Sequence, residues 1–377
     1  MPQSRFAFYE NNKESIQHIM RHTIVVDAGN GQTYAIKINP KHDAHVSIPS
    51  LRARVTGARL DYDGVQQMEF DYADYNGQRW VYGEDVLSVS RDAIDSHRGA
   101  FRYGDEFHKF MVSVACAELN VTTGIVDLIL FVPPGLYNAK APEVKGNFIG
   151  KNTIQLKDDL EPREWEWGSV SVKPEGLAGI ACFMLDKDGN FNKGAELEDR
   201  MVIVDIGMHT LDSVVSQKGI LNPESLPTAT IEHGGIMDHI LKPALAYIRK
   251  EVKSEDFSVL TVYDLNEVLR SGLTEDDWTL RFAGHSYNTK EVFEWFGKQH
   301  AQWIKNNLFD NMYNGLLGYS RTVVFGGGEA LTHKELADIY GGKFRSVRQV
   351  NVNPLEANAQ GAVRAEKAKR KQAAKNG

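Results

Sequence analysis

The sequence predicts an α/β protein built from two similar halves that enclose a cleft. A strand hairpin, a helix, a strand and another helix follow one another over residues 23–190, and much the same order recurs over residues 200–365. Residues 127–132 (DLILFV) and 321–325 (RTVVF) resemble strands buried on both faces of a sheet. Two α/β halves packed together leave a cleft, which is the usual place for a ligand.

The composition is that of a soluble globular protein. The chain has 377 residues, of which 42% are hydrophobic and 25% are charged. Two domains are expected, with one large domain as the alternative. No apolar run reaches about 18 residues, so no membrane span is expected, and residues 1–17 lack the apolar stretch of a signal peptide. Cys116 and Cys182 lie among apolar residues, which favours buried thiols in a cytoplasmic protein over a disulfide.

The net charge of −7 is unevenly distributed along the chain. Residues 364–377 contain six of the 43 basic residues and one of the 50 acidic residues, which leaves 37 basic and 49 acidic residues, or −12, elsewhere. An acidic body argues against direct, non-specific binding of nucleic acid. The basic tail is explained either by contact with DNA or an acidic partner, or by a solvated helix end.

The first half is predicted to follow an N-terminal extension of residues 1–22. Its strands are expected at residues 23–27, 33–38, 45–48, 127–132, 153–156 and 164–172. Asn76-Gly77 lies between alternating aromatic residues, which predicts a hairpin of type I′. Residues 105–119 have the apolar spacing of a helix, and Pro174 is expected to begin another that runs to Ala181.

The second half is predicted from similar signals. Its strands are expected at residues 201–205, 211–215, 321–325 and 346–352. Its helices are expected at residues 236–251, after the cap Asn288-Thr289, from Glu329 and from Pro354.

Each half begins with a strand, an aspartate and a glycine turn: 23-TIVVDAGNGQTYAIKI-38 and 201-MVIVDIGMHTLDSVV-215. One such hairpin alone is also explained by a turn that needs a positive φ angle. Two at equivalent places indicate facing backbone nests that hold phosphate oxygens. The residues expected to line them are Gly29, Asn30, Gly31, Gln32, Gly207, Met208, His209 and Thr210.

Asp27 and Asp205 end the first strands of the two halves. Carboxylates at these positions can hold Mg²⁺ through its bound waters, so both are expected to act in catalysis and metal binding.

A third glycine motif occurs in 322-TVVFGGGEALTHKELA-337. Gly326, Gly327 and Gly328 between a strand and a helix allow a flat ligand to approach the backbone, and the helix N-terminus at Glu329 favours an anion. The motif matches neither a Walker P-loop nor a dinucleotide fingerprint. Packing alone is the other explanation for the three glycines.

In this order and spacing, the three motifs resemble the phosphate-1, phosphate-2 and adenosine motifs of the actin-like ATPase superfamily. Residues 205–212 (DIGMHTLD) are similar to the phosphate-2 loop of the bacterial plasmid-segregation actins of the ParM type, and 353-NPLEANAQGA-362 is similar to their P-x-x-A-N-A-x-G segment. The resemblance extends over about residues 23–365. Between the motifs, the resemblance is limited to the order of the predicted helices and strands.

The resemblance implies an actin-like fold of two ribonuclease-H-like halves around a nucleotide cleft. Domain I would comprise residues 23–195 and 353–377, with a small outer subdomain at about 50–104, and domain II residues 196–352. The implied activity is hydrolysis of ATP to ADP with Mg²⁺, coupled to filament assembly. The implied partners are further copies of the chain and a DNA-binding adaptor for plasmid or phage DNA. Direct contact with DNA is expected at most from the basic tail, and no membrane is expected.

In ParM-type proteins a glutamate in a Pro-Glu turn orients the attacking water, and that turn is similar to 172-VKPEGLAG-179. Glu175 is therefore the expected base, since a carboxylate near the γ-phosphate can accept a proton from water. The other explanation is that Glu175 is a first-turn acid of a helix that follows Pro174.

The sequence departs from the pattern of its relatives in two places. Many relatives carry a phosphate-contacting lysine seven residues after the first aspartate, where this chain has Tyr34. Lys37 is expected to point to the opposite face of its strand. Either the backbone and Mg²⁺ suffice, or a basic residue from elsewhere in the chain takes the place of the lysine. We expect the former, so that Tyr34→Phe leaves nucleotide affinity nearly unchanged. Met208 and His209 replace small residues in the second turn.

Two other functions are compatible with the same superfamily. A small-molecule kinase would need an aspartate placed for a substrate hydroxyl, and no candidate motif is found. A non-polymerising ATP-dependent binding module is the remaining alternative, although the chain lacks the appended substrate domain of the chaperone branch.

Overall fold

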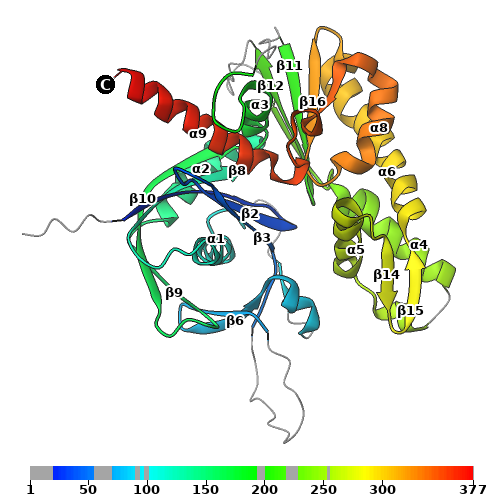
Figure 1. The fold of residues 1–377 in the computed structure, drawn as a ribbon. Helices are drawn as coiled ribbons and strands as arrows, with labels where there is room; N and C mark the ends of the chain where they lie inside the picture. Colours follow the sequence, from blue (N-terminus) through cyan, green and yellow to red (C-terminus); the bar gives the residue numbers. More distant parts are fainter. Residues whose placement is uncertain are drawn as a thin grey trace, which may run out of the picture.

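The computed structural model describes residues 20–54, 70–89, 94–96, 102–192, 200–217, 228–252 and 255–376. The predicted extension of residues 1–22 lies almost entirely outside the described residues, as does the segment 55–69 of the expected outer subdomain. Two α/β halves are visible, with the helices α3 (Leu177–Met184) and α9 (Ala357–Asn376) where they meet (Figure 1). In the described part of the chain, no helix has the length and apolar character needed to cross a bilayer.

A ten-stranded sheet in the order β3-β2-β1-β8-β10-β9-β5-β6-β4-β7 forms the first half. The strands are β1 (Arg21–Ala28), β2 (Gln32–Lys37), β3 (Ala44–Pro49), β4 (Arg52–Arg54), β5 (Tyr72–Tyr75), β6 (Gln78–Tyr82), β7 (Ile94–Asp95), β8 (Ile125–Val132), β9 (Lys151–Leu156) and β10 (Arg163–Pro174). The sheet curls around α1 (Glu106–Glu118), which is buried on nearly all sides, and α2 (Tyr137–Asn147) lies outside it (Figure 1). The predicted hairpin is confirmed, because Asn76 and Gly77 both have positive φ angles between β5 and β6.

A five-stranded sheet in the order β13-β12-β11-β16-β17 forms the second half. Its strands are β11 (Arg200–Ile206), β12 (Thr210–Gln217), β13 (Thr228–Glu232), β16 (Arg321–Phe325) and β17 (Phe344–Ser346), and β14 (Thr279–Phe282) pairs with β15 (His285–Asn288) at the outer end. The helices are α4 (Lys242–Val252), α5 (Val262–Glu275), α6 (Lys290–Ile304), the short α7 (Asn311–Tyr313) and α8 (Glu329–Tyr340). The buried side chains of α6 and α8 share one core with β11 and β16.

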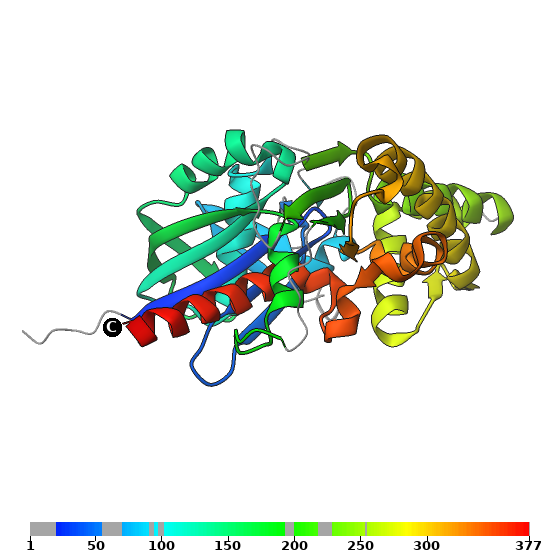
Figure 2. The same ribbon diagram turned by 90° about the horizontal axis from the view of Figure 1, so that it is seen from above.

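Helices α3 and α9 pack against each other between the two sheets. Apolar residues of α3 share a core with β11, β12 and β16, and those of α9 share another with β1, β2 and β8. The approach is close, since a Cβ added to Gly361 would lie 1.8 Å from the carbonyl oxygen of Ala178. Arg364 donates hydrogen bonds of 2.8 Å to the carbonyls of Cys182 and Leu185. Figure 2 shows α9 running along β1 toward this junction.

Two predicted boundaries were wrong. Pro174 does not begin a helix, because β10 pairs with β8 as far as Pro174 and Val132, and α3 begins only at Leu177. The strand expected at residues 346–352 is confined to Phe344–Ser346, and Val347–Val350 form a 3-10 turn. The Ser346 hydroxyl accepts a hydrogen bond from the backbone nitrogen of Arg348 at 3.1 Å, which favours the turn over an extended strand.

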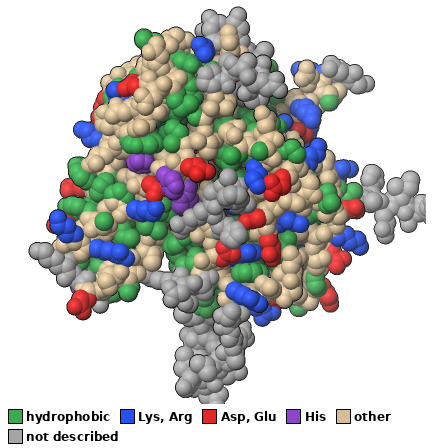
Figure 3. Space-filling model, turned by 180° about the vertical axis from the view of Figure 1, so that it is seen from behind, with side chains coloured by type: hydrophobic (Ala, Val, Ile, Leu, Met, Phe, Trp, Pro, Cys, Tyr) green, Lys and Arg blue, Asp and Glu red, His purple; other side chains and the backbone are tan. Residues whose placement is uncertain are grey.

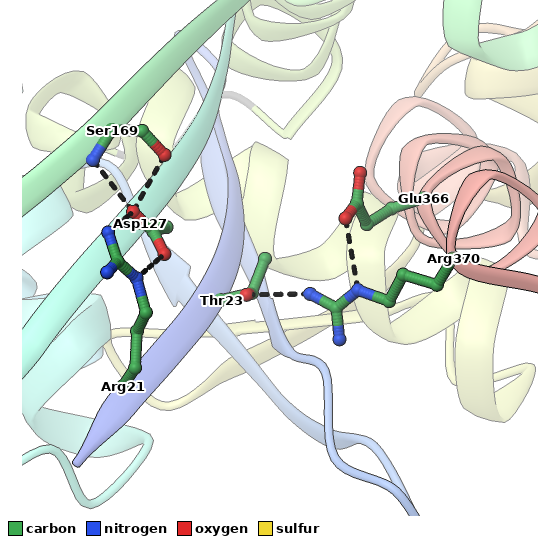
Figure 4. A network of polar contacts seen from close by, with 6 residues as sticks. All are labelled: Arg21, Thr23, Asp127, Ser169, Glu366 and Arg370. Atoms are coloured by element: carbon green, nitrogen blue, oxygen red, sulfur yellow. Dashed lines mark hydrogen bonds and ion pairs between the residues drawn. The ribbon is translucent and has the colours of Figure 1, made fainter. Parts of the chain in front are cut away.

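The basic tail forms the end of α9, which runs to Asn376. Some of its basic side chains bond to other residues of the chain. Arg370 donates hydrogen bonds to Thr23 at 2.7 Å and to Glu366 at 3.0 Å (Figure 4). On the neighbouring strands, Arg21 pairs with Asp127 at 2.5 Å (Figure 4). Cys116 and Cys182 are free and buried, as predicted.

Candidate functional site

A cleft of about 920 Å³, including its open mouth, lies between the two halves. Most of the predicted site residues line it, namely Asp27, Gly29, Asn30, Gly31, Gln32, Glu175, Asp205, Gly207, Met208, Thr210, Gly326 and Gly327. His209, Gly328 and Glu329 are absent from its lining.

The two glycine hairpins face each other across the cleft. A Cβ added to Gly31 would lie 3.4 Å from Cγ of Met208, so the tips of the two turns approach contact. The first turn is held by Ser50, whose hydroxyl donates to the carbonyl of Gly29 at 2.6 Å. The second turn adjoins the next helical segment, because the backbone nitrogens of Ile236 and Met237 donate to the carbonyls of Gly207 and Met208 at 3.1 and 2.8 Å.

The third glycine motif is divided between the cleft and the core. Gly326 has a φ angle of +89°, and a Cβ there would lie 2.3 Å from Oδ1 of Asp205, so only glycine fits at this position. Gly328 packs against β11, where a Cβ would lie 2.3 Å from Cγ2 of Ile206. Glu329 is buried and accepts a hydrogen bond from Arg348 at 2.9 Å. The presence of glycine at position 328 is therefore explained by packing against Ile206, and the position of the Glu329 side chain is explained by its ion pair with Arg348.

His209 lies on the other side of the second turn. It lines a smaller cavity together with Leu51, Met237 and Tyr263. Met208 lines both cavities and separates His209 from the main cleft.

Four carboxyl groups, those of Asp27, Asp205, Asp212 and Glu175, converge on the cleft and are at most 9% exposed. Burial raises the pKa of Asp205 to about 8 and the pKa of Asp27 and Asp212 each to about 6. Burial, with the charges of the three aspartates, raises the pKa of Glu175 well above its usual value. Burial therefore disfavours the ionised form of all four groups, and a cation bound in the cleft would favour it.

Hydrogen bonds fix these carboxyl groups in place. Asn358 of α9 donates from Nδ2 to Oδ2 of Asp205 at 2.8 Å and accepts from the backbone nitrogen of Gly176 at 3.0 Å. Thr210 and Thr230 each donate to Asp212 at 2.6 Å. Asn358 thus joins α9 to both halves of the cleft.

Glu175 lies in the turn between β10 and α3. Its backbone nitrogen donates to the carbonyl of Val132 at 2.8 Å, and Gly176 follows with a φ angle of +83°. The hydroxyl of Tyr103 donates to Oε1 of Glu175 at 3.2 Å. Since the helix begins at Leu177, Glu175 is not an acid of its first turn, and its side chain points into the cleft instead.

Sequence reasoning missed a second group of cleft residues. These are Tyr103, Asp212, Ile236, Asn266, Leu269, Arg270, Leu273, Phe325, Pro354, Leu355 and Asn358. Asp212 and Asn358 belong to motifs already recognised, so their polar side chains were a usable signal. The residues of α5 carry no motif, and only the folded chain brings them to the cleft.

Comparison with known proteins supports the same architecture. No family model and no curated protein matches the sequence. Among solved structures, an archaeal actin homologue has a TM-score of 0.69 at 19% identity, with 93% of this chain and 99% of that chain covered. The fold is actin-like. The resemblance inferred from the glycine motifs is thus confirmed at the level of the fold.

Two other actin-like structures match over nearly their full length. The ParM protein of a 15-stranded filament from Clostridium botulinum has a TM-score of 0.67 at 18% identity, with 93% of the actin-like chain described here and 99% of that chain covered. The actin-like protein Alp7A has a TM-score of 0.68 at 13% identity, with coverages of 95% and 100%. A further structure of the archaeal homologue is a complex with ADP.

Proposed function

We propose that this chain binds and hydrolyses ATP and assembles into filaments. The observation that carries the proposal is the meeting of two glycine hairpins and four buried carboxyl groups in one cleft between the halves. The archaeal homologue of the same fold is known with ADP, and a ParM neighbour is known as a filament.

The phosphates of the nucleotide occupy the space between the two hairpins. Gly29, Gly31 and Gly207 line this space, and backbone N–H groups of the two turns would donate to the phosphate oxygens there. The base lies toward α5 and Leu355, where apolar side chains and Gly326 line the cleft. This orientation places the γ-phosphate on the side of the cleft that contains Glu175.

Asp27 and Asp205 would hold Mg²⁺ through its waters, because both buried carboxyl groups line the cleft between the two hairpins. When bound, the ion neutralises charge on the phosphate oxygens. Glu175 then accepts a proton from the attacking water, because cations in the cleft favour its ionised form.

Filaments would carry plasmid or phage DNA through an adaptor rather than by direct contact. The body of the chain is acidic, and basic and acidic side chains are interspersed on the face shown in Figure 3. Arg370 of the basic tail is already paired with Glu366. An adaptor that binds both DNA and the filament avoids the electrostatic penalty of an acidic surface on DNA.

We expect the protein to sediment at micromolar concentration with Mg²⁺ and a non-hydrolysed ATP analogue, and to remain in the supernatant without nucleotide. The measurement is the pelleted fraction after high-speed centrifugation. Protein that stays in the supernatant under all conditions refutes filament assembly. If that protein still hydrolyses ATP, the non-polymerising ATPase module becomes the better description.

A further inference from the structure

Arg102 is a buried arginine beside the first glycine hairpin, and it belongs to none of the three motifs. Only 2% of its surface is exposed. Its Nη1 donates to Oδ1 of Asn30 at 3.2 Å, and its Nε is buried without a hydrogen-bond partner. Its guanidinium carbon lies 5.0 Å from the ring centre of Tyr103. Asn30 and Tyr103 both line the cleft, so the guanidinium adjoins it.

The positive charge of Arg102 is not cancelled by an ion pair with any residue that the structure describes. Asn30, its hydrogen-bond partner, is neutral. Beyond ion-pair distance, the carboxyl groups of Asp27 and Glu175 offset this buried charge, and an anion bound nearby would stabilise it further. Arg102 is therefore suited to a negatively charged ligand.

The charge of Arg102 acts on the carboxyl groups of the cleft. It lowers the pKa of Asp27 and of Glu175, opposing the larger effect of burial. Arg270 of α5 lines the cleft itself and lowers the pKa of Tyr34. Arg102 is thus placed on the side of Asp27 and Glu175, where the terminal phosphates are proposed to lie.

The two residues first considered for phosphate contact do not supply a charge there. Tyr34 lines the cleft but is uncharged, and burial raises the pKa of its hydroxyl further. Lys37 points away, as predicted, because its Nζ donates to the carbonyls of Leu119 and Asn120 at 3.3 and 3.5 Å. The first hairpin therefore has no cationic side chain of its own on the cleft side.

We propose that Arg102 binds the terminal phosphates of the nucleoside triphosphate and replaces the lysine that many actin-like proteins carry at the position of Tyr34. The proposal rests on the proposed function. In the bound state, the guanidinium exchanges Oδ1 of Asn30 for phosphate oxygens, and Nε gains its missing acceptor. A planar guanidinium can hold phosphate through two parallel hydrogen bonds.

The test compares the affinities of wild type, Arg102→Gln, Arg102→Met and Arg102→Lys for ATP, ADP and adenosine by calorimetry with Mg²⁺. We expect the charge-free variants to weaken ATP binding roughly 10- to 100-fold, as for the loss of a charged hydrogen bond. The loss should be smaller for ADP and absent for adenosine, while Arg102→Lys retains most of the affinity for ATP. Arg102→Met is included because an apolar chain is easier to bury than an unpaired amide.

The control variant is Arg52→Gln, which removes another buried arginine but lies in the outer part of the first half, paired with Asp95. It should keep the wild-type ratio of ATP to adenosine affinity, and Tyr34→Phe should keep it as well. A charge-free Arg102 variant that melts cooperatively and retains that ratio refutes the role of Arg102 and leaves the proposed function intact. Wild-type protein that binds no ATP refutes the proposed function itself.

Discussion

Glu175→Gln is expected to bind ATP with near wild-type affinity and to hydrolyse it roughly 10²- to 10⁴-fold more slowly, as for the loss of a general base. The amide has nearly the same shape as the carboxyl group and still accepts a hydrogen bond from Tyr103, so the turn between β10 and α3 should be preserved. It cannot accept the proton of the attacking water. Single-turnover hydrolysis and calorimetric binding, measured on the same preparation, separate the two effects.

Glu166→Gln is the matched control, because Glu166 lies on the same strand and is exposed to solvent. Its turnover should equal that of wild type.

Tyr103→Phe provides an intermediate change, since it removes the hydroxyl that donates to the ionised carboxylate. The loss of that hydrogen bond should shift the acidic limb of the pH–rate profile of hydrolysis to higher pH. Unchanged turnover in Glu175→Gln removes Glu175 from the role of base.

Asp205→Asn is expected to abolish Mg²⁺-dependent hydrolysis and, at the same time, to stabilise the protein without nucleotide at pH 8. Asp205 is buried beside Gly326, and its pKa is raised to about 8. Asparagine keeps the shape and can still bond to Asn358, but it carries no charge to hold the waters of Mg²⁺. The turnover rate in excess Mg²⁺ and the melting temperature without nucleotide are the two measurements.

The sign of the pH effect follows from the direction of the shift. A carboxyl group whose pKa rises from 3.8 in the unfolded chain to about 8 in the folded protein binds its proton more tightly when folded. Its contribution to the free energy of unfolding is therefore fully present below about pH 4. This contribution is lost as the pH rises to about 8. Wild-type protein should lose stability over this range, and Asp205→Asn should lose less.

Asp188→Asn is the control for this comparison, because Asp188 lies in an exposed turn. Its melting temperature should follow that of wild type at every pH. If Asp205→Asn melts below wild type at pH 8, the carboxyl group is not a buried, unfavourable charge there. Normal Mg²⁺-dependent turnover of Asp205→Asn contradicts the assignment of the second hairpin as a phosphate site.

Local patterns in the sequence predicted the parts of the fold that depend on neighbouring residues. The strand, aspartate and glycine of both hairpins are encoded within a few positions, and β8 is recognisable from DLILFV alone. Asn76-Gly77 requires positive φ angles, which few other residue pairs tolerate. Such patterns predict the folded structure correctly because they depend on backbone sterics and on the alternation of side chains along a strand.

The cleft residues that were missed depend on contacts between distant parts of the chain. Arg102 and Asn30 are separated by 72 positions, and Asn358 and Asp205 by 153. No spacing rule connects such pairs. Glu329 is the opposite case, because its place after three glycines suggested a ligand while the folded chain pairs it with Arg348. A sequence motif indicates where a turn lies. Which of its side chains reach the cleft depends on how the two halves pack together.

The course of the backbone from β10 into α3 has a mechanical consequence. At Gly176 the chain leaves the sheet of the first half and enters a helix whose apolar face packs on the sheet of the second. A rotation of one half against the other must therefore bend the chain within or beside this turn. Glu175 is the residue immediately before Gly176, so its carboxyl group would move whenever the angle between the halves changes. Closure of the cleft and alignment of the base would then be one movement rather than two.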